Sequence, residues 1–329
     1  MKDRIRLNLA LQGGGAHGAF TWGVLDRLLE EPWFEIEGVS GTSAGAMNAL
    51  MLAEGWRKSR AEGAREQLAL FWEELMQPVN LSTNALGDTV GWLWQSISSH
   101  LSPYDLNPFD INPLRDLLEE CVDFEALRRA SPFKLYIAAT AIENGKLKLF
   151  RESELKVEHL LASACLPRLH QAVEIEGRYY WDGGFAGNPV LYPLLMEGKS
   201  LDLLMVLLQP MERASLPTSS QAIADRVAEL GFQTAFMREM RAVVLMQQRL
   251  KRRPWLLGSL ERRFRHLRFH LVGPDETLAS LHRSTKYDTS RTFLYELRDR
   301  GRDQASRFIS LHGNKLGKRT SCVLQRNFL

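Results

Sequence analysis

The sequence predicts an α/β protein with a mainly parallel central sheet covered by helices on both faces. Two observations indicate this fold class. Short apolar runs of the kind that buried strands show alternate along the chain with longer segments in which apolar residues recur at helical spacing. Twice near the beginning of the chain, an apolar run leads through glycines into such a helical segment. Active sites of such folds lie at the carboxyl ends of the strands, so functional residues are expected there.

The N-terminal elements follow each other closely. Residues 5–11 predict a buried strand that ends in a glycine turn, and apolar residues at helical spacing predict a helix over residues 16–31, which Pro32 ends. Residues 34–40 predict a second strand, which leads into a helix of small residues. Residues 64–76 predict a further amphipathic helix.

Two hairpins are predicted in the middle of the chain. Apolar runs on either side of Asn144-Gly145, over residues 134–150, predict the first, because Asn-Gly tolerates the positive φ angles of a type I′ turn. The second spans residues 172–181 and turns at Glu176-Gly177.

The C-terminal part is predicted to be mostly helical. The continuous apolar run at residues 201–208 is typical of a buried parallel strand. A long helix is then predicted over residues 222–250, a last strand over 266–272 and a last helix over 289–311.

Composition excludes several classes of protein. The 329 residues are 45% hydrophobic and 25% charged, which excludes collagen-like, mucin-like and disordered chains. No apolar run approaches the roughly 18–20 residues of a membrane-spanning helix. The apolar stretch near the beginning of the sequence is too short for a signal peptide. A cytoplasmic protein is therefore expected. Three separate cysteines, Cys121, Cys165 and Cys322, predict neither a disulfide framework nor a zinc site. No cluster predicts a metal or a cofactor.

The net charge of +3 hides a division along the chain. Residues 1–200 carry 19 Lys and Arg against 27 Asp and Glu, whereas the remainder carries 23 against 12. The excess concentrates in Arg238–Arg268, where ten basic residues accompany only Glu239 and Glu261. This segment fits an anionic surface, either lipid headgroups or nucleic acid, and it fits a solvated helix face equally well.

A G-x-S-x-G motif, in which Gly41 and Gly45 flank Ser43, lies between a predicted strand and a predicted helix. That context is the one a nucleophile elbow requires, since the sharp turn projects the serine oxygen out of the backbone. Ser43 is therefore the candidate nucleophile.

The earlier glycine loop has two interpretations. Amide groups at Gly13, Gly14 and Gly15, ahead of Gly18, can converge on an anion at a helix N-terminus and so form an oxyanion hole. The same residues satisfy the G-x-G-x-x-G pattern of a nucleotide-binding module, but that fold needs an acidic residue at the end of the second strand, where this chain has the serine motif. A phosphate-binding P-loop is also not predicted, because no Lys-Ser/Thr follows the glycines.

The base that would activate the serine is less obvious. In an ordinary α/β-hydrolase the elbow follows several strands and a histidine completes the triad, whereas Ser43 follows only two strands and no later histidine lies in a glycine-flanked strand end. Asp182 does: it ends a hairpin strand and precedes Gly183 and Gly184. The other interpretation of these three residues is a plain Asx turn.

Taken together, these motifs resemble the patatin-like phospholipase family. The resemblance rests on the glycine loop at residues 13–18, the serine motif at 41–45, and Asp182-Gly183-Gly184 with the downstream Asn188-Pro189. The stretch at residues 162–167 resembles the family's approach to its aspartate. Order and spacing match over about residues 5–210.

The resemblance implies a three-layer patatin-like fold and a Ser–Asp dyad without histidine that hydrolyses acyl esters of lipids. Ser43 would be the nucleophile, Asp182 the general base, and the amides of Gly13, Gly14 and Gly15 the oxyanion hole. The chain departs from the family at His17, where many members carry Arg or Lys. An aspartate is a poor base at its ordinary pKa near 3.9, so we expect Asp182 to be largely desolvated.

The resemblance implies a division of the chain into a hydrolase core over residues 1–210 and a basic, mostly helical extension over 211–329 packed on it. Residues 78–113, rich in Asn, Ser, Gly, Pro and aromatics, are interpreted as a lid or cap, whose Trp92 and Trp94 fit an exposed lipid-facing surface or buried packing.

The resulting hypothesis is a cytoplasmic serine esterase, peripheral at membranes, that acts on phospholipids or other acyl esters. Neutral glycerides, lysophospholipids and storage polyesters fit the same dyad. A nucleotide-binding module at Gly13–Gly18 and a nucleic-acid binder at Arg238–Arg268 are the rivals from other classes, and nucleic acid is the less favoured partner.

Overall fold

The computed structural model describes residues 4–77, 102–107, 110, 112–213, 216–252 and 257–329. Eight strands form one sheet in the order β5-β6-β3-β2-β1-β7-β8, with β4 also paired to β3. The pairs β1–β2, β1–β7, β2–β3 and β7–β8 are parallel, whereas β4 and β6 run antiparallel to β3 and β5 runs antiparallel to β6. The strands are β1 (Ile5–Leu11), β2 (Phe34–Thr42), β3 (Lys134–Ala141), β4 (Leu147–Arg151), β5 (Val173–Ile175), β6 (Arg178–Asp182), β7 (Asp202–Val206) and β8 (Arg268–Val272). The predicted mainly parallel α/β sheet is confirmed.

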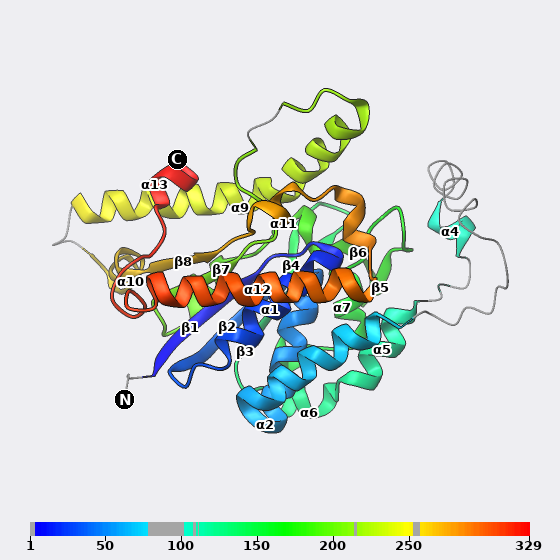
Figure 1. Ribbon diagram of the computed structural model, residues 1–329, viewed down its shortest axis with the longest axis horizontal. Helices are drawn as coiled ribbons and strands as arrows, with labels where there is room; N and C mark the ends of the chain where they lie inside the picture. Colours follow the sequence, from blue (N-terminus) through cyan, green and yellow to red (C-terminus); the bar gives the residue numbers. More distant parts are fainter. Residues whose placement is uncertain (1–3, 78–101, 108–109, 111, 214–215, 253–256) are drawn as a thin grey trace.

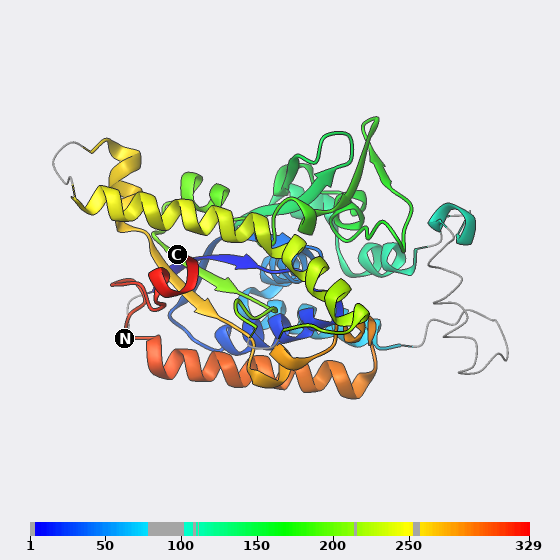
Figure 2. The same ribbon diagram turned by 90° about the horizontal axis from the view of Figure 1, so that it is seen from above.

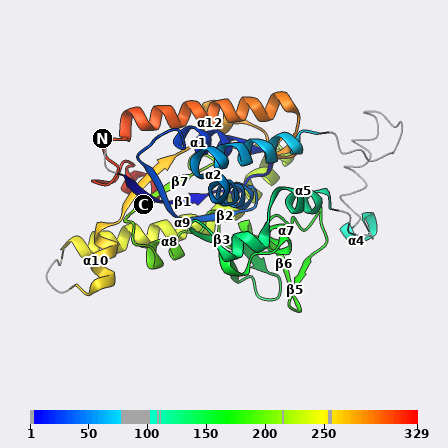
Figure 3. The ribbon, with the colours of Figure 1, turned by 90° about the horizontal axis from the view of Figure 1, so that it is seen from below.

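Helices cover both faces of this sheet (Figures 2 and 3). On one face lie α1 (Gly18–Leu28), α2 (Ala44–Leu75), α5 (Pro113–Cys121), α6 (Phe124–Arg129), α7 (Val157–Ser163) and α12 (Arg291–His312). On the other lie α8 (Tyr192–Glu197), α9 (Ser220–Arg252), α10 (Ser259–His266) and α13 (Leu324–Phe328). Short elements complete the chain: α4 (Pro103–Leu106), α11 (Glu276–Ser280), η1 (Gly15–His17), η2 (Glu152–Glu154), η3 (Gly183–Phe185) and η4 (Arg283–Tyr287). Among the described residues, no helix is both long and apolar enough to cross a membrane.

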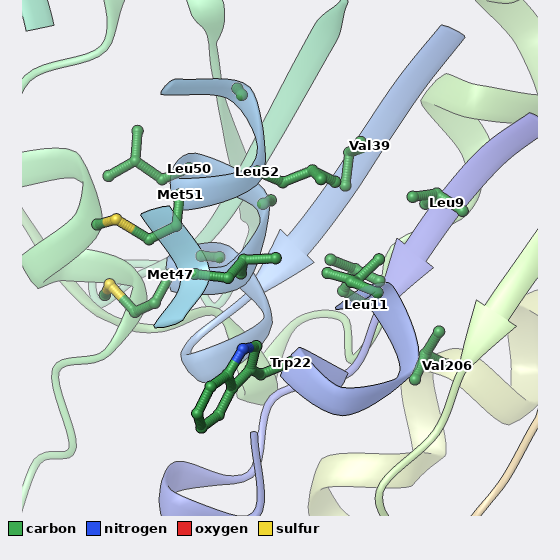
Figure 4. Close-up of a cluster of buried hydrophobic side chains, with 14 of the residues drawn as sticks. Leu9, Leu11, Trp22, Val39, Met47, Leu50, Met51, Leu52 and Val206 are labelled. Atoms are coloured by element: carbon green, nitrogen blue, oxygen red, sulfur yellow. The ribbon is translucent and has the colours of Figure 1, made fainter. Parts of the chain in front are cut away.

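Alternation along the central strands explains the three layers. Leu7, Leu9 and Leu11 of β1 face the α1 side, whereas Ala10 faces the α9 side. Figure 4 shows the first of these cores, where Trp22 of α1 and Met47 of α2 lie over the strands. A central strand buried on both faces reads as a continuous apolar run, which is why the sequence indicates β1 so clearly.

The closest helix pair joins the two ends of the chain. A Cβ at Gly23 of α1 would overlap the carbonyl oxygen of Arg298, and a Cβ at Gly301 of α12 would overlap that of Phe20. The backbones of α1 and α12 therefore touch where both helices lack a side chain (Figure 3). As a result α12 buries Leu294, Leu297 and other side chains in the same core as β1. The division at residue 210 stays a prediction, although β8 and α12 share the sheet and core of the residues before it.

Several local predictions need adjustment. The hairpin over residues 134–150 forms, but its turn is not type I′: Gly145 has a φ of 69°, Asn144 does not have a positive φ, and Gly145 N–H donates to Ala141 O. The type I′ turn lies instead at Glu176 and Gly177, whose φ values are 53° and 75°. The loop between β3 and β4 is longer than the two-residue turn between β5 and β6, and in it only Gly145 has a positive φ.

Two helix boundaries also differ from the prediction. The helices expected before and after residue 60 form the two arms of α2, which breaks at Ser59 and Arg60. The last strand begins at Arg268 rather than His266, because α10 extends to His266.

Candidate active site

Ser43 stands at a strained turn between β2 and α2. It has a φ of 54° and a ψ of −124°, a conformation that a residue with a side chain adopts only where its surroundings enforce it. Its carbonyl oxygen accepts from the N–H of Ala46 at 2.8 Å, and its own N–H donates to Ser163 Oγ at 2.9 Å. The predicted elbow is therefore present in this structure, with Gly41 and Gly45 on either side.

The sheet itself brings Asp182 to Ser43. On one edge of β3, Thr42 of the parallel strand β2 pairs with Ala138, and Asp182 of the antiparallel strand β6 pairs with Ala139. Strand β4 occupies the opposite edge of β3 at both positions. Strands β2 and β6 thus run toward each other along a single edge and end at adjacent positions. Residues 43 and 182 meet at this junction although 139 residues separate them in sequence.

Asp182 is almost completely buried, with 1% of its surface exposed. Burial raises the pKa of its carboxyl group to about 6, and hydrogen bonds from Gly184 N–H and from the Ser43 side chain oppose that shift. The Gly184 bond is 2.7 Å long, and the Asp182 backbone is held by Cys165 O and Thr140 Oγ1, each at 2.8 Å. The predicted desolvation is confirmed, and the Asx turn through Gly184 coexists with the contact to Ser43.

The glycine loop lies between the end of β1 and η1. Asn188 clamps its first glycine: Gly13 N–H donates to Asn188 Oδ1 at 2.6 Å, and Asn188 Nδ2 donates to Gly13 O at 3.3 Å. Within the described ranges, no hydrogen bond occupies the amides of Gly14 and Gly15. Of the three amides predicted for an oxyanion hole, Gly13 is thus engaged by a side chain, and the next two remain available.

Close packing explains the remaining glycines of the motifs: backbone atoms approach Gly13, Gly41, Gly45 and Gly183, and side chains approach Gly18 and Gly184. A Cβ would collide with neighbouring atoms at each of Gly13, Gly18, Gly41, Gly45, Gly183 and Gly184. At Gly15 the reason is twofold, because its φ is 60° and a Cβ there would overlap the backbone oxygen of Lys286.

Residues from η4 complete the site, and the sequence carries no signal for them. Thr285 Oγ1 donates to His282 O, so it accepts from His17 Nε2, which lies 2.8 Å away. Burial, helped by the charge of Lys286, lowers the pKa of His17 to about 4, so this ring is neutral. The residue that replaces the family's Arg or Lys therefore ties the glycine loop to η4 instead of carrying a charge.

A cavity of about 620 Å³ opens over Ser43 and Asp182. Its lining has two unlike walls. The apolar wall comes from α2, α5 and the segment after α7, and consists of Met47, Phe71, Trp72, Leu75, Leu114, Leu166 and Leu169. The other wall, called the charged wall here, comes from the segment before α9, from α9, and from η4 with the residues before it. Apart from Asp182, it carries all the charged side chains of the lining together with apolar ones: Arg213, Asp225, Arg226, Glu229, His282, Arg283 and Lys286, and Leu216, Ala222, Phe232, Leu278 and Leu281. Such a cavity can receive a molecule with an apolar chain and a polar head.

Histidines are not part of the catalytic contact in the part of the chain described. His17, His170 and His282 line the cavity, but none is hydrogen-bonded to Ser43. His159 stacks on Phe150 at 4.0 Å between ring centroids and is buried in the core. The ionisable side chain that contacts Ser43 is the carboxylate of Asp182.

The sequence predicts two lipid-facing surfaces, the cap over residues 78–113 and the basic segment Arg238–Arg268. Trp92 and Trp94, with most of the predicted cap, lie outside the described residues. In the basic segment, Arg268 pairs with Asp202 at 2.5 Å and Arg263 donates to backbone oxygens of Leu194 and Leu195. These two arginines hold the fold, whereas Arg238, Arg241, Arg249 and Arg252 are exposed along α9.

Comparisons with solved structures find large bacterial proteins over most of this chain. VipD from Legionella pneumophila is structurally similar with a TM-score of 0.45 and 15% identity, over 95% of this chain and 68% of that chain. The type III effector ExoU of Pseudomonas aeruginosa in complex with SpcU has a TM-score of 0.38 and 16% identity, over 96% of this chain and 52% of that chain. This chain thus spans about half of ExoU. Among curated proteins, none matches the sequence.

The sequence model of one family matches residues 9–195, under the description patatin-like phospholipase. That range is more than half of the chain, and it contains the glycine loop, Ser43 and Asp182. The chain therefore belongs to the patatin-like phospholipase family.

Proposed function

We propose that the protein hydrolyses acyl esters of lipids through Ser43 and Asp182. Membership of the family places it among lipid acyl hydrolases. The observation that carries the proposed mechanism is the contact between the Ser43 side chain and a buried carboxylate at the junction of β2 and β6. No metal or cofactor enters the proposal.

In the proposed reaction, Asp182 removes the proton of Ser43 Oγ while that oxygen attacks the ester carbonyl carbon. The tetrahedral oxyanion accepts hydrogen bonds from the amides of Gly14 and Gly15, which have no other partner in the described chain. Protonated Asp182 then gives its proton to the leaving alkoxide, and an acyl-enzyme on Ser43 remains. Water, deprotonated by Asp182, attacks this acyl group; the bond to Ser43 Oγ breaks, Asp182 returns the proton to that oxygen, and a fatty acid is released.

The two walls of the cavity support a lipid as the substrate. Met47, Phe71 and Leu114 can receive an acyl chain, and the charged wall can face a polar head. A nucleotide-binding module is less well supported, because β2 ends in Thr42 and the nucleophile rather than in an acidic residue.

The test of this function compares substrates rather than variants alone. Wild-type protein and Ser43→Ala are given a short-chain chromogenic ester, a lysophospholipid, phosphatidylcholine vesicles and a triacylglycerol emulsion, and released fatty acid or chromophore is measured. We expect Ser43-dependent hydrolysis of the lipids. Cleavage of the soluble ester alone would leave the mechanism and remove the lipid assignment.

The acid limb of the pH profile follows from the burial of Asp182. Only the carboxylate can act as a base, and burial raises its pKa from 3.8 to about 6. We therefore expect kcat/KM for a neutral chromogenic ester to fall about tenfold per pH unit below about 6. Its measurement between pH 4 and 8 would contradict the assignment if activity stayed constant down to pH 4.5 while the protein remained folded.

The outward face of α9 supports attachment to an anionic membrane. The helix contains only three carboxylates, Asp225, Glu229 and Glu239. Asp225 and Glu229 line the cavity, and Glu239 is mostly buried and accepts from Leu191 N–H. The exposed face carries instead Ile223, Val227, Leu230, Arg238, Arg241, Leu245, Met246, Arg249 and Arg252. In Figure 2 this helix lies on the side of the molecule opposite α12.

We expect the protein to sediment with vesicles that contain anionic lipid, and to do so less as salt rises. Reversing two charges in Arg241→Glu/Arg249→Glu should weaken this binding at least about tenfold, at roughly 1 kcal/mol per charge removed. Lys318→Glu/Arg319→Glu changes the same number of exposed charges elsewhere and serves as the control. Equal losses in both variants, or binding independent of salt, would contradict α9 as the attachment surface.

A further inference from the structure

Two cations of η4 lie on one face of that element and reach the catalytic cavity. Arg283 and Lys286 are three residues apart in a 3-10 helix, where side chains at that spacing eclipse each other. Both line the cavity, and their charges are close enough that Arg283 lowers the pKa of Lys286. The backbone of η4 is fixed against the glycine loop by the bond from His17 to Thr285 and by the contact of Lys286 with Gly15.

The carboxylates of this wall have partners other than Arg283 and Lys286. Glu229 pairs with Arg213 at 2.9 Å and with Arg226 at 2.8 Å. Asp225 Oδ1 accepts from Gln221 Nε2 at 3.0 Å, and Asp225 Oδ2 lies 3.1 Å from His282 Nε2 without a hydrogen bond. Asp182 is engaged by Ser43 and Gly184. Within the described ranges, neither Arg283 nor Lys286 has a carboxylate at ion-pair distance. No carboxylate of the described cavity lining therefore forms an ion pair with Arg283 or Lys286, and both cations can bind an anionic group of a ligand.

An unpaired ammonium in this position is costly. Desolvation, and after it the charge of Arg283, lower the pKa of Lys286 to about 8, although Glu229 and Asp182 act in the opposite direction from beyond contact distance. Charged side chains that lose most of their contact with water are normally paired, because nothing else compensates for their desolvation. A cationic pair kept in this state beside a nucleophile is typical of a site that is completed by an anionic ligand.

We infer that Arg283 and Lys286 form an anion subsite that holds the phosphate of the ester substrate while its acyl chain lies on the apolar wall. This inference rests on the proposed hydrolysis by Ser43. It selects among the esters that the dyad accepts: phosphate-bearing acyl esters over neutral glycerides. Arginine and lysine both recognise phosphate oxygens, the former through its planar fork and the latter as a point charge.

The free carboxylate of a fatty acid product is a second source of the same negative charge. The arrangement of the substrate favours the phosphate. With the acyl chain on the apolar wall, the carboxyl carbon of a fatty acid lies beside Ser43, whereas the phosphate of a headgroup lies beyond the ester oxygen, on the side of the charged wall. The experiment separates the two sources.

The first arm measures substrate preference. Lys286→Met removes the charge and keeps the length of the side chain, Lys286→Arg keeps the charge, and Lys318→Met removes an exposed charge far from the lining of the cavity. For each variant, kcat/KM is measured on a lysophospholipid and on the monoacylglycerol with the same acyl chain. We expect Lys286→Met to lower the ratio of the two values about tenfold to a hundredfold, mainly through KM for the lysophospholipid, as loss of a charged hydrogen bond does.

Lys286→Arg should restore most of this ratio, and Lys318→Met should leave it unchanged. A ratio that stays constant in Lys286→Met overturns the inference. So does an equal loss on both substrates, which would mean that Lys286 acts on Asp182 rather than on the substrate. If wild-type protein hydrolyses neither ester, the proposed function fails, and the second arm still tests the subsite.

The second arm measures binding without turnover. Dodecyl phosphate and dodecanoate are titrated calorimetrically into Ser43→Ala and into Ser43→Ala/Lys286→Met at pH 7. We expect the second substitution to weaken dodecyl phosphate at least tenfold and dodecanoate much less. Equal weakening of both would assign the subsite to the fatty acid and overturn the phosphate assignment. Unchanged binding of both would overturn the subsite.

Discussion

Ser43→Ala and Asp182→Asn should each lower kcat/KM for ester hydrolysis by about 10³-fold or more, and the double variant should be no worse than either alone. The two side chains act as one unit, since the hydroxyl is a weak nucleophile without the carboxylate and the carboxylate has no reaction without the hydroxyl. The measurement is initial rates on the short-chain chromogenic ester with stopped-assay detection of slow turnover. Multiplicative losses in the double variant would show that the residues act independently.

Asp182→Asn should be more stable than the wild-type protein at pH 7, although it is less active. Burial raises the pKa of Asp182 above its unfolded value of 3.8, so the folded state prefers the protonated carboxyl. The contribution of the protonated carboxyl group to the free energy of unfolding is complete below pH 3.8 and is lost as the pH rises through about 6. The ionised carboxylate therefore opposes folding at pH 7. Asp182→Asn should therefore raise the free energy of unfolding at pH 7 by about 1–3 kcal/mol.

Ser43→Gly provides a second comparison, because it relieves the positive φ of the elbow and keeps the Asp182 carboxylate, while it removes the hydroxyl that contacts this carboxylate. We expect it to stabilise the fold by about 1 kcal/mol and to remove activity. Denaturant unfolding of wild type, Ser43→Gly and Asp182→Asn tests both effects. Destabilisation in Asp182→Asn at pH 7 would mean that the carboxylate is better solvated than its burial indicates.

The second large effect is expected at the crossing of α1 and α12. Gly23→Ala places a methyl group on the carbonyl oxygen of Arg298, and neither backbone can retreat without opening the core. We expect a loss of about 3 kcal/mol in the free energy of unfolding, larger than the gain in helix propensity that alanine brings. Gly301→Ala, which meets Phe20 O from the other side, should behave alike.

Gly231→Ala is the matched control, since a Cβ there meets nothing within 4 Å and the residue also lies in a helix. It should stabilise the protein by about 0.5–1 kcal/mol. Thermal and urea unfolding of the three variants give the comparison. If Gly23→Ala were as harmless as Gly231→Ala, α12 would be a loosely attached element, and residues 211–329 would behave as a separable extension.

The sequence predicts well those elements that local patterns determine. The strand at Ile5–Leu11 is buried on both faces, so its apolar run is unbroken, and the glycines after it and around Ser43 are demanded by backbone contacts nearby. Asp182 was identifiable because Gly183 and Gly184 follow it directly. These features are visible in the sequence because the motif residues stand next to one another, although the atoms that exclude a side chain at Gly13 and Gly45 belong to Thr42 and Leu11.

Long-range contacts carry no such signal. Lys286 and Thr285 reach the glycine loop across more than 260 residues, from a short element with no periodicity of its own. The clamp from Asn188 to Gly13 is similarly remote, although the residue itself belonged to a recognised motif. Charge counting also misled in part, because Arg263 and Arg268 bind backbone and Asp202 rather than facing outward. Composition cannot tell a structural arginine from a solvated one.

The meeting of β2 and β6 on one edge of β3 has a consequence for how this enzyme can diversify. The spacing of Ser43 and Asp182 is set by adjacent positions of β3, at Ala138 and Ala139. The charged wall comes from η4 and α9, which do not pair with β3. In the proposed mechanism, the catalytic pair and the headgroup contacts therefore come from separate parts of the chain. Randomising Arg283 and Lys286, with Thr285 kept because it holds His17, should yield variants with new ester preferences and an undisturbed Ser43–Asp182 pair.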